Sequence, residues 1–140
     1  MNTLPLPFAD RTRVERLPLG DGIALLRRFA ETARLMPLIR EIAAVAPFRH
    51  LVTPGGQTMS VAMTNCGPVG WVSDRSGYRY SSRDPLTDSA WPQMPREFVR
   101  LALAAAAAGG FPDFMPDACL INRYSAGARL TAHRDADEQN

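Results

Sequence analysis

The chain has 140 residues, enough for one domain, and its 46% hydrophobic and 21% charged content is typical of a folded globular protein rather than a disordered one. No apolar run reaches the roughly 20 residues of a membrane-spanning helix, and the first residues lack the pattern of a signal peptide. Two cysteines are too few for a disulfide framework, so we expect a cytoplasmic protein. The net charge of +2 says little, and the 16 basic residues are all arginines, which fits either a G/C-rich genome or phosphate recognition.

The N-terminal part predicts an arm, a strand and a helix. Residues 1–19 combine proline and charge without a period, and we interpret them as an irregular arm. Residues 22–29 follow a glycine turn and predict a short strand. Apolar residues at helical spacing predict a helix over 30–45, with Pro37 in its first turn and Pro47 after its end.

The middle of the chain predicts extended structure. After a turn at Pro54, alternating residues point Met59 and Met63 to one face of a strand. Residues 70–80 predict two short strands around a turn, and the prolines of 81–96 predict a loop.

The C-terminal part predicts a helix and two more strands. The helix starts at Pro95, runs to about Ala108 and ends at a pair of glycines. The apolar residues 118–124 predict a buried strand, and a turn at Gly127 leads into a second strand over 129–133.

One short motif near the C-terminal end indicates metal chemistry. His133 and Asp135 are separated by one residue, so in a strand they would face the same side. An imidazole, a carboxylate and a second histidine form the facial triad of non-haem Fe(II) oxygenases, which leaves coordination positions open. The same tripeptide is also compatible with a solvated polar tail.

The residues around this motif resemble those of AlkB-type dioxygenases, which are Fe(II)- and 2-oxoglutarate-dependent enzymes that repair alkylated nucleobases. Residues 116–135 resemble the first metal-binding segment of that family, and residues 52–67 resemble its nucleotide-recognition segment. Shorter matches follow in the family's order at Gly70-Trp71, Gly77-Tyr78-Arg79-Tyr80, Trp91-Pro92, Met94-Pro95 and Gly110-Phe111-Pro112-Asp113. The resemblance covers about residues 20–138.

The resemblance implies an α+β fold, a double-stranded β-helix (jelly roll) with N-terminal helices and a nucleotide-recognition lid at about residues 51–82. The chain then divides into the arm at 1–19 and the N-terminal part of an Fe(II)/2-oxoglutarate dioxygenase domain at 20–140. The family's second histidine and its 2-oxoglutarate-binding arginines have no counterpart in these residues. We therefore expect a C-terminally truncated chain that lacks the second half of the jelly roll, is inactive alone and is poorly stable.

The resemblance also implies roles for single residues. His133 and Asp135 match Fe(II) ligands, and Asn122 and Tyr124 match the side chains that bind 2-oxoglutarate. Trp71 matches the aromatic residue that stacks on the damaged base. The other positions that match contacts to the base or to the nucleic-acid backbone are Thr53, Met59, Ser60, Met63, Tyr78, Arg129 and Asp137.

Several of these residues also have purely structural interpretations. Met59 and Met63 would suit a hydrophobic core, and Trp71 would suit one as well. Asn122 and Tyr124 could instead end a strand. The other histidine of the chain, His50, matches no ligand of the family, and we interpret it as a surface or packing residue.

We therefore predict the oxidative dealkylation of alkylated bases in single- or double-stranded DNA, or in RNA, with Fe(II), 2-oxoglutarate and O2 and with formaldehyde, succinate and CO2 as products. We expect a monomer without a membrane partner. Two other functions stay open: a nucleic-acid-binding remnant without catalysis, and a dioxygenase of the same fold with a substrate other than nucleic acid. Residues 53–80 favour a nucleotide, because that segment carries the resemblance to nucleotide recognition.

Overall fold

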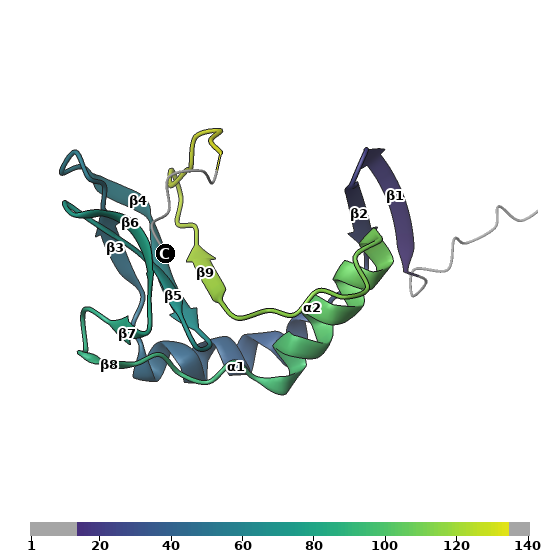
Figure 1. The fold of residues 1–140 in the computed structure, drawn as a ribbon, viewed down its shortest axis with the longest axis horizontal. Coiled ribbons are helices and arrows are strands. Elements are labelled where there is room, and N and C mark those ends of the chain that lie inside the picture. Colours follow the sequence, from purple (N-terminus) through teal and green to yellow (C-terminus); the bar gives the residue numbers. More distant parts are fainter. Residues whose placement is uncertain (1–13, 135–140) are drawn as a thin grey trace, which may run out of the picture.

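The structure, a computed structural model, describes residues 14–134. These residues form β1 (Glu15–Gly20), β2 (Ile23–Arg27), α1 (Thr32–Val45), β3 (Arg49–Val52), β4 (Thr58–Cys66), β5 (Gly70–Asp74), β6 (Gly77–Ser81), β7 (Arg83–Asp84), β8 (Ser89–Ala90), α2 (Arg96–Gly109) and β9 (Cys119–Arg123). Strands β3 to β8 lie on one side of the molecule, α1 runs along its base, and α2 rises beside the β1–β2 hairpin on the other side (Figure 1). Neither helix of residues 14–134 is long and apolar enough to cross a membrane.

Strand β4 is the centre of a three-stranded antiparallel sheet in the order β3-β4-β9. Every residue from Val61 to Cys66 is buried, so both faces of this half of the strand are covered. On one face the Thr64 hydroxyl donates a hydrogen bond of 2.6 Å to the carbonyl oxygen of Ala46, which follows α1. On the other face Asn65 contacts the antiparallel β5–β6 hairpin.

Helix α1 confirms the predicted helix but corrects the place of its proline. We expected Pro37 in the first turn, and it lies further inside the helix. Proline lacks the N–H that would bond the carbonyl four residues back, at Ala33. Both residues are exposed, so water can solvate that carbonyl. The helix ends at Val45, before Pro47 as predicted.

The predicted arm is corrected at its C-terminal end. Residues 15–20 form strand β1, which pairs with the predicted strand β2 in an antiparallel hairpin. Pro18 is tolerated because a two-stranded sheet has an outer edge where no N–H donor is needed. Residues 1–13, the rest of the predicted arm, lie outside the described residues.

The predictions for the second helix and the last strands have mixed outcomes. Helix α2 ends before Gly110, whose φ of 100° suits a glycine cap, and this confirms the prediction within one residue. Strand β9 is confirmed, but it is half-buried to exposed instead of buried. Residues 129–133 are not a strand. Within residues 14–134, β9 pairs only with β4, so the expected strand has no neighbour to hydrogen-bond with.

An ion pair that the sequence did not indicate joins β7 to β3. The Arg49 guanidinium donates two hydrogen bonds, of 2.7 and 2.8 Å, to the Asp84 carboxylate, which is 0% exposed. The guanidinium also lies 5.3 Å from the ring centre of Trp91, in the small core that Trp91 forms with Ala46 and Val72. Burial alone would raise the pKa of Asp84, but hydrogen bonds from Arg49 and from nearby groups outweigh it and hold the pKa below its usual value.

Replacing the buried carboxylate tests this pair. We expect Asp84→Asn to lower the free energy of unfolding by about 3 kcal/mol, because it leaves a largely buried guanidinium without its counter-charge. Urea unfolding followed by circular dichroism measures the change. Asp88→Asn is the matched control, since Asp88 pairs with Arg83 at the surface, and it should cost about 0.5 kcal/mol or less. Equal stability of the two variants would contradict a structural role for the buried pair.

Candidate functional site

Two aromatic rings stack on the β5–β6 hairpin. The ring centres of Trp71 and Tyr78 are 5.5 Å apart, and the ring planes meet at 16°. The register pairs Trp71 with Tyr80 and Ser73 with Tyr78, so these four side chains share one face of the hairpin. Both stacked side chains are partly exposed. Because the rings are already in contact, a bound base would have to stack on an outer face of the pair.

A buried amide fixes the backbone of Trp71 to β4. The Asn65 side chain accepts a hydrogen bond of 2.9 Å from the Trp71 N–H and donates one of 2.9 Å to the Trp71 carbonyl oxygen. Asn65 is 2% exposed. A Cβ atom at Gly70 would lie 2.5 Å from Trp91 and 2.8 Å from the Asn65 Cβ, so only glycine fits there. The sequence signal for this clamp was a polar residue near the end of an alternating strand.

The turn of the same hairpin is held by an ion pair. Asp74 accepts hydrogen bonds of 3.0 and 2.8 Å from the Arg79 guanidinium, and 2.8 Å from the Ser76 N–H. The hydrogen bond from Arg79 is the main cause that lowers the pKa of Asp74. Both partners are partly exposed, so this pair orders the turn more than it stabilises the fold.

The methionines predicted to contact the base lie on β4, next to the residues of β9 and its C-terminal end that are predicted to bind 2-oxoglutarate. Met63 is 2% exposed and pairs directly with Asn122, so the two side chains share a face of the sheet. Met59 lies on the same face of β4 and is half-buried, and Tyr124 follows β9 and is exposed. Strand β5, which carries Trp71, packs against both β4 and β9.

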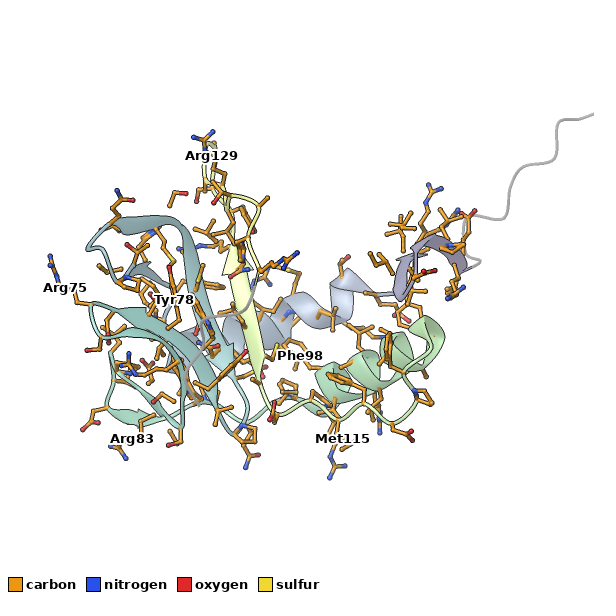
Figure 2. The ribbon with its side chains drawn as sticks, turned by 45° about the horizontal axis from the view of Figure 1, so that its top comes forward. Arg75, Tyr78, Arg83, Phe98, Met115 and Arg129 are labelled. Atoms are coloured by element: carbon orange, nitrogen blue, oxygen red, sulfur yellow. The ribbon has the colours of Figure 1, made fainter. Side chains whose placement is uncertain are left out.

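Ser60 and Thr53 have structural partners. The Ser60 hydroxyl donates a hydrogen bond of 3.0 Å to the Arg129 carbonyl oxygen and accepts one of 3.1 Å from the Arg129 N–H. Arg129 itself extends from the tip of the loop after β9 (Figure 2). The Thr53 hydroxyl accepts a hydrogen bond of 3.1 Å from the Gln57 N–H and so closes the turn before β4.

His133 lies in the loop after β9, with its Nδ1 2.7 Å from the Thr131 carbonyl oxygen. A carbonyl oxygen only accepts, so Nδ1 is the donor in this contact. Metal-binding histidines commonly donate in this way, and the residue therefore fits a metal ligand. Asp135 and Asp137 lie outside the described residues. Within residues 14–134 no three His, Cys, Asp or Glu side chains gather as a metal site.

His50 fits the predicted surface or packing role, because its side chain is exposed. It lies on β3, opposite Ala62, and its Nδ1 is 2.9 Å from the Met59 carbonyl oxygen. This contact links β3 to the strand that carries the methionines. The structure thus places the stacked aromatic rings, the two methionines of β4 and Asn122 on neighbouring strands. It places His133 in a loop.

The amino-acid sequence is similar to those of known proteins. Residues 22–140 match the family model of the 2OG-Fe(II) oxygenase superfamily. The chain is 56% identical over 133 residues to the alpha-ketoglutarate-dependent dioxygenase AlkB of Escherichia coli (strain K12), and 53% identical over 133 residues to that of Salmonella typhimurium. Each of these alignments covers 94% of this chain and 61% of the relative, so the chain spans less than two thirds of their length.

A more distant relative is the DNA N(6)-methyladenine demethylase ALKBH1C of Arabidopsis thaliana. It is 33% identical over 88 residues, which are 52% of this chain and 19% of that protein.

The Ser60 contact gives a local prediction. We expect Ser60→Ala to lower the free energy of opening at the Arg129 amide by about 1 kcal/mol, because that N–H loses its acceptor. Hydrogen exchange of the loop after β9, measured by NMR or mass spectrometry, reports the change. Thr58→Ala is the control, since Thr58 is an exposed hydroxyl on the same face of β4. Equal protection of Arg129 in wild type and Ser60→Ala would show that this contact does not hold the loop.

Proposed function

We propose, because the chain belongs to the 2OG-Fe(II) oxygenase superfamily and is of the AlkB type, that it forms the base-recognition part of an enzyme that oxidatively dealkylates nucleic acids. Fe(II), 2-oxoglutarate and O2 are the cofactors that this family implies. The observation that carries the proposal is the partly exposed Trp71–Tyr78 stack, clamped to β4 by Asn65.

The stack supports binding of a base that has left its helix. Extruding a base costs a few kcal/mol, and the cost is smallest in single strands and at damaged pairs. Stacking on an aromatic side chain returns about 1–3 kcal/mol per base. The hydrogen bonds from Asn65 lower the entropic cost of base binding, because the backbone of Trp71 is already fixed before the base arrives. Met59 and Met63 would supply an adaptable apolar wall beside it.

The cosubstrate and metal residues are assigned from the family resemblance and from donor chemistry. The Asn122 amide and the Tyr124 phenol are hydrogen-bond donors, which suits the carboxylates of 2-oxoglutarate. His133 and Asp135 would hold Fe(II), with the Nδ1–H donation to Thr131 orienting the imidazole. When bound, Fe(II) with its cosubstrates supplies the oxidation that removes the alkyl carbon as formaldehyde and leaves succinate and CO2.

The remaining residue assignments belong to nucleic-acid contacts. Arg129, at a loop tip, would meet a phosphate, and Ser60 would act by holding that loop in place. Thr53 would place the turn before β4 against the nucleic-acid backbone. Asp137 would lie near the exocyclic amine of the base. An arginine fork binds phosphate well, because it offers several N–H donors in one plane.

These 140 residues hold two of the three ligands that a facial triad needs. Their two histidines are His50 and His133, and His50 is turned to the Met59 carbonyl oxygen within the sheet. We propose that further strands complete a jelly roll beside β9 and supply the third ligand. The chain alone would then bind a base without converting it, so we expect a nucleic-acid-binding activity first.

Binding is tested with a single-stranded oligonucleotide that carries one ring-N-methylated base. We expect Trp71→Ala to weaken its binding by about tenfold or more, because a stacking surface is lost. Fluorescence anisotropy gives the Kd, and circular dichroism checks the fold. Phe114→Ala is the control, since Phe114 is an exposed aromatic residue in the connection after α2. If the oligonucleotide does not bind the wild type, a substrate other than nucleic acid is favoured.

Turnover is tested separately. With Fe(II), 2-oxoglutarate and O2, we expect the 140-residue chain to release formaldehyde and succinate from the methylated oligonucleotide only at the level of a protein-free control. The physical reason is the incomplete donor set for the metal. Formaldehyde release that depends on iron and disappears in His133→Ala would contradict this expectation and would show that these residues suffice for catalysis.

A further inference from the structure

Two cysteines face each other across the strands of the candidate site. Cys66 ends β4, Cys119 begins β9, and the register makes them direct partners. Both are free thiols. Cys66 is 0% exposed, whereas Cys119 is partly exposed, so one thiol is accessible and the other lies behind it. The pair is placed at the end of the β4–β9 ladder, where strands open most readily.

The pKa values of the two thiols are shifted in opposite directions. A hydrogen bond between them raises the pKa of Cys66, together with burial, and lowers the pKa of Cys119. Cys119 is therefore the sulfur with more thiolate character. A thiolate is the form of cysteine that attacks electrophiles and binds soft metals.

The donor set of this pair decides which ligand fits. A structural zinc ion needs four protein ligands, and within residues 14–134 no third His, Cys, Asp or Glu joins the two sulfurs. A ligand that takes two bonds from the protein and keeps a substituent of its own fits better. Trivalent arsenic has this valence, and one arsenic atom can bridge the thiols of two directly paired residues on adjacent antiparallel strands.

We propose that Cys66 and Cys119 form a dithiol site for a trivalent arsenical. With phenylarsine oxide, Cys119 attacks first because it is the accessible sulfur, and Cys66 closes the bridge. Two As–S bonds form, the arsenic–oxygen bond breaks, and the oxygen leaves with both thiol protons as one water molecule. Arsenic stays trivalent, so the step needs no oxidant or reductant.

An arsenic bridge would affect the candidate site, because the bridge joins β4 and β9, the strands that carry site residues. Met63 and Asn122 are partners on the same ladder, three residues along each strand from the cysteines. A bound arsenic atom would fix the distance between β4 and β9 at this end of the ladder. A bridge that is present only in the folded arrangement also raises Tm.

The test uses the intact chain and phenylarsine oxide, followed by mass spectrometry under native conditions. We expect one phenylarsenic adduct per chain, with loss of both free thiols and a higher Tm. A bridge resists a monothiol, because its second bond forms within one molecule, so glutathione should displace the adduct about a hundredfold less effectively than from Cys119→Ser or Cys66→Ser. A small dithiol should remove it.

Two outcomes would overturn the proposal. One is an adduct on the wild type that glutathione displaces as easily as from Cys119→Ser. The other is two adducts per chain, which would mean that the thiols react separately. If Cys66→Ser fails to fold, the wild type still decides, because its glutathione resistance can be compared in buffer and in urea. A true bridge becomes sensitive to glutathione once the strands separate.

Discussion

The arrangement of the candidate site depends on the burial of β4 on both faces. Six successive residues, Val61 to Cys66, are inside the protein, so the polar side chains among them need partners. Thr64 finds its acceptor at the end of α1, and Asn65 finds both of its partners on the backbone of Trp71. Within residues 14–134 no buried side-chain donor or acceptor lacks a partner. The hydrogen bonds that the buried polar side chains of β4 require therefore position α1 and the β5–β6 hairpin.

This constraint acts differently on the residues proposed for base recognition and on those proposed for metal binding. The Trp71–Tyr78 stack and the Met63–Asn122 pair are held by β4 through hydrogen bonds and direct strand pairing. The segment that leads to His133 is tied to β4 by the Ser60–Arg129 contact. The residues proposed to recognise a base are thus organised by β4, whereas His133, the proposed metal ligand, lies in a loop.

The β4–β9 ladder links the two sets of residues and also carries the cysteine pair. Met63 pairs with Asn122, and Cys66 pairs with Cys119 at the end of the same ladder. The proposed bridge between the sulfurs would therefore join the two strands that carry Met63 and Asn122, the residues proposed to contact the base and 2-oxoglutarate.

Local sequence patterns determined where most elements begin and end, and which residues carry the family resemblance. Pro47 and Gly110 end the helices as expected, because proline and glycine act on their own backbone. Only the tertiary structure decided which residues became partners: Asn65 with Trp71, Arg49 with Asp84, and Cys66 with Cys119. It also left His133 outside a strand, although the sequence around it alternates. Pairing depends on which distant segments become neighbours, and no local pattern encodes that.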